Sequence, residues 1–130
     1  MISSVNNFST TNTTHGKIPL VPFIKIKEEA LGKDYSLSLV FIGEVRSRKL
    51  NNTYRSKNKP TNILSFPLDK NQGEIFITLS VAKKEAKSFD RKLDNFVEFL
   101  FTHGLMHLKG YGHGSTMEKA ESKLRKKFKV

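Results

Sequence analysis

Residues 93–110, LDNFVEFLFTHGLMHLKG, carry apolar side chains at spacings of three and four along most of their length. The apolar positions are Leu93, Phe96, Val97, Leu100, Phe101, Leu105 and Leu108. This period predicts a helix with one apolar face, and that face can be buried only against a core built by the rest of the chain. A chain of 130 residues is long enough to form such a core as one domain, residues 1–130.

The segments on either side of this helix predict further helices and a sheet. Strands are predicted at residues 35–43, 61–68 and 73–80, with another short strand in the polar N-terminal segment. Helices are predicted within residues 19–33 with a stop at Gly32, at the start of 44–60, at 81–89 and at 115–129. In DKNQG, between two of the strands, Asn71 and Gly73 suit a tight reversal. The expected fold is α+β, with a small mixed sheet of about four strands and about five helices.

Charge limits the classes of partner. The chain has 23 Lys and Arg residues against 12 Asp and Glu residues, a net charge of +11. Such a surplus attracts polyanions through the release of counterions, and nucleic acid is the commonest such partner. The alternative is a solvated basic surface that only keeps the protein soluble. Charge alone does not distinguish DNA from RNA.

The absence of cysteine limits the possible metal sites. Disulfides and thiolate sites are excluded, so any metal must be held by nitrogen and oxygen ligands. Residues 1–17 are rich in Ser, Thr and Asn and do not resemble a signal peptide. No stretch approaches the roughly 18 apolar residues that a membrane span needs. We therefore expect a soluble cytoplasmic protein with no membrane partner.

Three of the four histidines lie within HGLMHLKGYGH, residues 103–113. His103 and His107 are four residues apart on the predicted helix, so both side chains project from one face and can chelate one ion. Gly110 ends the helix, and the turn after it can return His113 as a third ligand. Three imidazoles with one open position are typical of catalytic zinc. A lone helical histidine is more often a packed core residue, but three at this spacing favour a metal site.

The histidine spacing also matches the metzincin protease pattern H-E-x-x-H-x-x-G-x-x-H. In those proteases the glutamate deprotonates the water that attacks the peptide. Gly104 occupies that position here. Peptide hydrolysis by this route is therefore disfavoured, and the basic surface points toward phosphodiesters instead.

The sequence resembles the YbeY family of bacterial rRNA maturation factors. HGLMHLKGYGH is similar to the family signature H-G-x-L-H-L-x-G-Y-D-H, with Met106 in place of Leu and Gly112 in place of Asp. LNNTYRSKNKPTNILSFPL is similar to L-N-x-x-Y-R-x-K-D-K-P-T-[DN]-V-L-S-F, GEIFIT to G-D-[IL]-V-I, and MEKAE to M-E-x-x-E. The resemblance runs from about Lys49 to Phe128, which is most of the chain.

The resemblance implies a zincin-like fold with the metal site at the end of a core helix. It implies a zinc-dependent, single-strand-specific endoribonuclease that acts in rRNA maturation (16S rRNA 3′-end processing) and ribosome quality control. His103, His107 and His113 would bind one Zn²⁺ ion, and all three would be catalytic together with Arg55. The implied partners are single-stranded RNA or rRNA, the small ribosomal subunit and a ribosome-associated GTPase.

The expected mechanism is hydrolysis of RNA by metal-activated water. Arg55 would hold the scissile phosphate, because a guanidinium can contact two phosphate oxygens at once. On sequence context alone Arg55 would be interpreted as a solvated surface base. Lysines such as Lys49, Lys57 and Lys59 would draw in the strand.

Gly112 is the main departure from the family pattern. An aspartate there could orient a metal ligand or assist proton transfer, and glycine can do neither. A carboxylate such as Glu118 or Glu121 could substitute for it. The glycine is consistent with an alternative hypothesis, a ribosome-assembly or RNA-binding factor that keeps the fold but has weakened catalysis. A zinc metalloprotease is a third, less favoured hypothesis. Phe66 and Tyr111 are candidate platforms on which RNA bases could stack.

Overall fold

The computed structural model describes residues 2–5, 7–110 and 115–128, with side chains described for 7–110 and 118–128. The elements in chain order are β1 (Ile2–Val5), β2 (Phe8–Asn12), α1 (Phe23–Leu31), β3 (Ser36–Ile42), α2 (Glu44–Arg55), β4 (Ile63–Asp69), β5 (Gln72–Thr78), α3 (Leu79–Ser88), α4 (Leu93–Leu108) and α5 (Ser115–Phe128). None of the helices in these residues is both long and apolar enough to cross a lipid bilayer.

The strands form one mixed sheet in the order β1-β2-β3-β5-β4. The pairs β2–β3 and β3–β5 are parallel, whereas β1–β2 and β4–β5 are antiparallel hairpins. The predicted α+β class is confirmed. The described sheet has five strands, because the N-terminal segment supplies a hairpin where one short strand was expected. Asn7 has a φ of 58°, a left-handed conformation that asparagine tolerates in hairpin turns.

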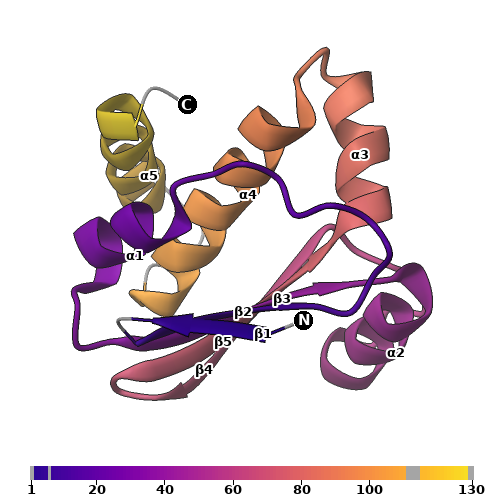
Figure 1. The fold of residues 1–130 in the computed structure, drawn as a ribbon, viewed down its shortest axis with the longest axis horizontal. Coiled ribbons are helices and arrows are strands. Elements are labelled where there is room, and N and C mark those ends of the chain that lie inside the picture. The colour runs from indigo at the N-terminus through magenta and orange to yellow at the C-terminus, as the bar shows by residue number, and fades with distance from the viewer. Residues whose placement is uncertain (1, 6, 111–114, 129–130) are drawn as a thin grey trace.

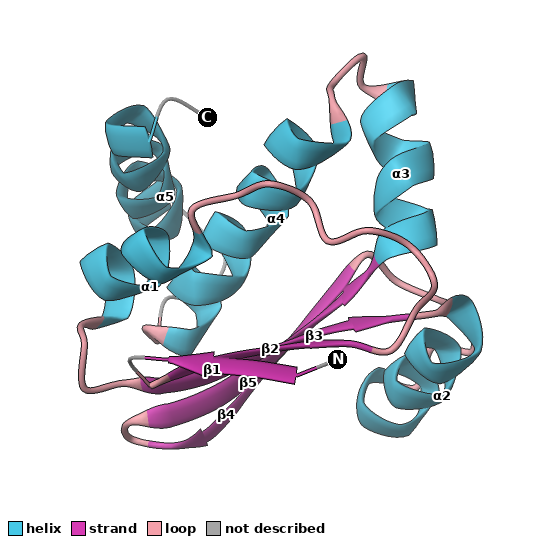
Figure 2. Cartoon of the chain, in the orientation of Figure 1, coloured by secondary structure: helices cyan, strands magenta, loops and turns pink. Residues whose placement is uncertain are grey.

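The sheet buries its two faces unequally. Helices α1, α3, α4 and α5 lie on one side of it (Figure 1), where they share the larger core with the inward side chains of β3 and β5. Helix α2 lies apart from them and packs through Leu50 against a smaller cluster on the other face. That cluster consists of Val40, Ile42, Leu64 and Phe76, with Phe66 at its margin. Figure 2 shows β4 at the edge of the sheet opposite β1.

Helix α4 buries the face that its sequence period predicts. Phe96, Val97, Leu100, Phe101 and Leu105 are all buried, and Leu93 and Leu108 pack at the margin of the same core. Gly110 has a φ of 102° and donates its N–H to the carbonyl oxygen of His107 at 3.1 Å, so the helix ends where the glycine predicted. The face of α4 that carries His103 and His107 lies beside β4 and α5.

The reversal predicted in DKNQG is present, but Gly73 is not part of it. The chain turns between Asp69 and Gln72, where the backbone N–H of Asn71 donates to Oδ1 of Asp69 at 2.8 Å. Gly73 lies within β5, and a Cβ atom there would sit 2.5 Å from the Tyr35 hydroxyl oxygen. Close packing against Tyr35, rather than the turn, therefore requires this glycine.

Candidate active site

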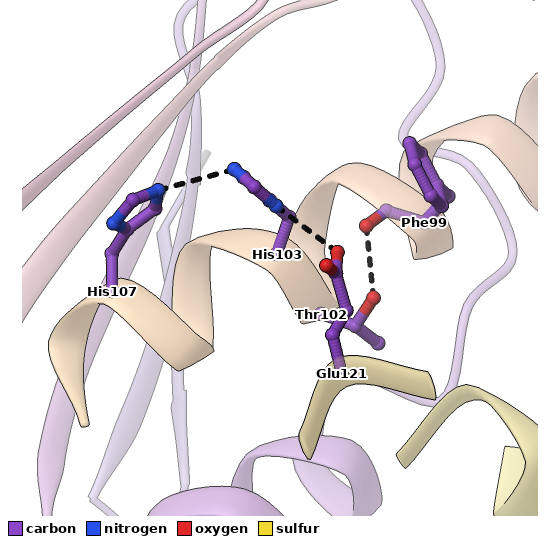
Figure 3. Close-up of polar contacts among 5 residues, drawn as sticks. All are labelled: Phe99, Thr102, His103, His107 and Glu121. Atoms are coloured by element: carbon purple, nitrogen blue, oxygen red, sulfur yellow. Dashed lines mark hydrogen bonds and ion pairs between the residues drawn. The ribbon is translucent and has the colours of Figure 1, made fainter. Parts of the chain in front are cut away.

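His103 and His107 come together on one face of α4, as their spacing predicts. Their Nε2 atoms are 3.1 Å apart, and the two rings are nearly perpendicular, with an interplanar angle of 81°. Figure 3 shows both imidazoles rising from successive turns of the helix and meeting through these nitrogens. The two Nε2 atoms are therefore placed so that both could bind the same metal ion.

The separation of the two nitrogens suits zinc. Two ligands about 2.0–2.1 Å from a tetrahedral zinc ion lie roughly 3.4 Å from one another, close to the distance observed. Neutral imidazole is also a preferred zinc ligand. The third expected ligand, His113, lies outside the described residues. Within residues 7–110 and 118–128, no group of three His, Asp or Glu side chains is placed to hold a metal.

Glu121 on α5 supports the first histidine of the pair. Its Oε1 atom lies 3.0 Å from Nδ1 of His103 (Figure 3), and its side chain is only 9% exposed. A carboxylate that accepts the Nδ1 proton leaves the Nε2 lone pair of a neutral imidazole available to a metal. Of the two carboxylates named from the sequence, Glu121 is the one that contacts the pair, while Glu118 is exposed.

A cleft of about 680 Å³ opens beside the histidine pair. Its lining comprises Tyr54 and Arg55 from α2, residues 61–67 from β4 and the loop before it, and Phe99, Leu100, His103 and His107 from α4. Residues almost fifty positions apart in the sequence are thus brought to one surface. Arg55 shares this cleft with His103 and His107, as the family resemblance implied.

Hydrogen bonds from α2 fix the basic loop that follows Arg55. The Ser47 hydroxyl donates to the Thr61 carbonyl oxygen at 3.0 Å and accepts from the Thr61 N–H at 2.9 Å. Asn51 donates through Nδ2 to the Lys59 carbonyl oxygen at 2.8 Å. Ser47 and Asn51 are both buried, and sequence analysis missed them. Their spacing could have indicated this role, because two small polar residues four positions apart lie on the same face of a helix.

The segment around Arg55, along α2 and the loop after it, carries unbalanced positive charge, and we call this segment the basic rim. Arg55, Lys57 and Lys59 are exposed on the end of α2 and its loop, and Lys49 is exposed earlier on α2. The ion pairs formed by the described lysines and arginines are Lys84 with Glu44 and Lys127 with Glu29, so none neutralises the rim. This rim is therefore suited to bind the phosphates of a polyanion.

Gly104 allows α4 to lie close to β4. A Cβ atom at this position would be 2.8 Å from Cδ1 of Ile63 and 2.9 Å from Oγ of Ser65. The glutamate that metzincin proteases carry at this position would fit only if the side chains of Ile63 and Ser65, or the helix itself, shifted. The missing protease base therefore has a packing explanation.

The chain is similar to known proteins along almost its whole length. Residues 7–129 match the family described as Endoribonuclease YbeY. The Endoribonuclease YbeY of Onion yellows phytoplasma (strain OY-M) is 34% identical over 128 residues, which cover 91% of this chain and 84% of the relative. That of Acholeplasma laidlawii (strain PG-8A) is 32% identical over 124 residues, covering 92% and 87%.

A solved structure shares the fold. The solution structure of TM1509 from Thermotoga maritima superposes with a TM-score of 0.62 at 22% sequence identity, covering 90% of this chain and 85% of that one. The family match and the identity to curated relatives agree with the motifs that line the cleft. The chain belongs to the Endoribonuclease YbeY family.

Proposed function

We propose that this protein is a zinc-dependent endoribonuclease that cuts single-stranded RNA. The observation that carries the proposal is the shared cleft, in which Arg55 of α2 lies with His103 and His107 of α4. The name of the family and the net charge of +11 support RNA as the substrate. A zinc ion held by His103, His107 and, from the motif, His113 would activate water and polarise a phosphoryl oxygen.

The side chains of the cleft would bind and orient the RNA. The exposed Arg55 guanidinium can donate to two oxygens of one phosphate and stabilise the charge that grows on it during hydrolysis. Lys57 and Lys59 would attract the flanking phosphates from a loop that Ser47 and Asn51 hold in place. Glu121 would keep His103 in the tautomer and orientation that a metal ligand needs.

The family resemblance supports a role in ribosome biogenesis. We propose that the substrate is rRNA in the cytoplasm, that the cut contributes to maturation of the 16S rRNA 3′ end and to ribosome quality control, and that the partners are the small ribosomal subunit and a ribosome-associated GTPase. The basic rim around Arg55 would bind an rRNA segment through its phosphates, whatever the sequence of that segment.

Gly112 supports a second candidate function, an RNA-binding assembly factor with weakened catalysis. The contact between Glu121 and His103 favours the enzyme, since it supplies a carboxylate to the histidine pair without an aspartate at position 112. The packing of Gly104 against Ile63 and Ser65 argues against a metalloprotease of the metzincin type. RNA turnover separates the two remaining functions.

The experiment compares purified wild type with Arg55→Ala and Arg55→Lys on a labelled single strand and on the same strand in a duplex. We expect wild type to cut the single strand, and Arg55→Ala to cut it about 100-fold more slowly. Arg55→Lys should recover only part of the rate, because an ammonium cannot contact a phosphate bidentately. Arg48→Ala, an exposed arginine of α2 outside the cleft lining, is the control.

Three results would be decisive. Equal rates for wild type and Arg55→Ala would remove Arg55 from the mechanism. Tight RNA binding without turnover would establish the assembly factor instead. Neither binding nor cutting would reject RNA as the ligand.

A further inference from the structure

We propose that Tyr54 and Phe66 form a stacking subsite for an unpaired nucleobase next to the phosphate that Arg55 holds. The inference rests on the proposed function, because its ligand is single-stranded RNA. It adds a specificity-determining element to the cleft and a physical reason for preferring single strands.

The two rings form a pair at the wall of the cleft. Their centroids are 4.9 Å apart with the planes inclined by 59°, and both residues line the cleft that contains His103 and His107. Tyr54 is nevertheless 64% exposed. A large aromatic ring that is held on one side and open on the other is the feature on which single-stranded nucleic acids stack.

The exposed ring is anchored to the protein interior. Phe66 packs edge-on against Phe76, with centroids 5.8 Å apart and planes at 72°, and Phe76 is 6% exposed within the smaller core. The three rings thus form a row from the sheet interior to the cleft. A ring fixed in this way loses little conformational freedom when a base binds, so most of the stacking energy is available for affinity.

The aromatic pair lies next to Arg55 in the chain and in the cleft. Tyr54 directly precedes Arg55, so their Cα atoms are about 3.8 Å apart, and both side chains line the same cleft. A phosphate at Arg55 would place the attached base within reach of Tyr54. The cleft, at about 680 Å³, lies in the range of sites that enclose a small organic ligand.

Stacking at Tyr54 would select against duplex RNA. A base in a helix has both faces covered by its neighbours, and its Watson–Crick edge is paired. It can reach the Tyr54 ring only after unstacking and unpairing, which costs free energy that a single strand does not spend. The aromatic pair would therefore discriminate by strand state without reading sequence, since every base has a π-face.

Phe89 provides a matched control. It is an exposed aromatic of similar exposure, 67%, and its ring also packs on another phenylalanine, Phe96, at 5.9 Å between centroids. It does not line the cleft. A general effect of removing a surface ring would therefore affect Phe89 and Tyr54 variants alike.

The test measures binding in chelator, so that the RNA stays intact. Short single-stranded RNAs carrying 2-aminopurine at successive positions are titrated with full-length wild type, Tyr54→Phe, Tyr54→Leu and Phe89→Leu. We expect wild type and Tyr54→Phe to quench the fluorophore at one position. Tyr54→Leu, which still covers Phe66, should lose the quenching and bind roughly 5- to 100-fold more weakly. Phe89→Leu should match wild type.

Thermal melting of each variant establishes that it is folded, and Tyr54→Phe, which keeps the ring, serves as the second test should Tyr54→Leu unfold. Retained quenching and affinity in folded Tyr54→Leu would overturn the subsite while leaving the nuclease proposal intact. Loss of both in Tyr54→Phe would also overturn it, because the ring is still present. RNA that binds no variant, wild type included, both in chelator and with zinc restored, would overturn the proposed function and the subsite together.

Discussion

Nδ1 of His103 on α4 lies 3.0 Å from Oε1 of Glu121 on α5, so the C-terminal helix supplies a carboxylate to the histidine pair. The two residues are 18 positions apart and meet because α4 and α5 pack side by side. Gly112 stands where the family signature has an aspartate. Glu121, which matches the last glutamate of the family stretch M-E-x-x-E, orients His103 whether or not an aspartate stands at position 112.

The first prediction concerns Glu121. Glu121→Gln should weaken zinc binding about 10- to 100-fold, because a neutral amide is a poorer acceptor for the Nδ1 proton of His103. Isothermal titration calorimetry of metal-stripped protein measures the change. Glu118→Gln, on an exposed face of the same helix, should bind zinc like wild type. An unchanged affinity in Glu121→Gln would show that the contact does not tune the metal.

The second prediction concerns the histidine pair. His103→Ala and His107→Ala should each lose stoichiometric zinc, because each removes one of two nitrogens that converge on the same point. Metal analysis after dialysis against limiting zinc gives the stoichiometry. His15→Ala changes an exposed histidine distant in sequence and should retain one zinc per chain. One zinc per chain in both pair variants would place the metal elsewhere.

The third prediction tests the close packing of Gly104. Gly104→Ala should lower the free energy of unfolding by about 1–2 kcal/mol, since overpacking against Ile63 and Ser65 outweighs the roughly 1 kcal/mol gained in helix propensity. Ile63→Val removes Cδ1, the atom nearest to the new Cβ. The double variant should therefore be less destabilised than the sum of the single variants. Strict additivity in chemical denaturation would contradict this account.

The fourth prediction uses the buried Lys27 of α1. Lys27 is 0% exposed, and its Nζ donates to the Lys33 carbonyl oxygen at 3.2 Å. Burial lowers the pKa of Lys27 below its ordinary value of 10.5, against the opposing effects of Glu28 and Asp34. The cost of the buried charge is full below the folded pKa and disappears above the unfolded pKa.

Lys27→Met should therefore be more stable than wild type at neutral pH, and the difference should shrink as the pH rises toward 10.5. Thermal melting from pH 7 to pH 10.5 measures it. Lys25→Met, an exposed lysine on the same helix, should show no such trend. A difference that stays constant with pH would mean that charge burial is not its cause.

Sequence analysis could predict α4 and the histidine pair because both depend on one helical period. The apolar stripe from Leu93 to Leu108 determines which face of the helix is buried, and two residues four positions apart then share the other face. The family motifs added Arg55, whose context alone indicated only a surface base. The position of Arg55 in the cleft depends on where α2 ends, and no hydrophobic periodicity in the motif predicts that end.

Other parts of the site could not be predicted because they depend on packing between distant elements. The sequence offered Glu118 and Glu121 as equal choices, and only the rotation of α5 decides which one reaches His103. Tyr54 was missed because its partner, Phe66, comes from a strand. The N-terminal hairpin was missed because its residues are mostly polar. They show no alternation of apolar and polar side chains that would distinguish two strands from one strand followed by a loop.

The most direct test of the account is cleavage of a labelled single-stranded RNA by metal-stripped protein before and after zinc is restored, with His107→Ala and Arg55→Ala measured in parallel. The account predicts no cutting without metal, cutting on addition of one equivalent of zinc, and loss of that activity in both variants, with zinc still bound by Arg55→Ala. Cutting by metal-free protein, or undiminished cutting by His107→Ala, would contradict it.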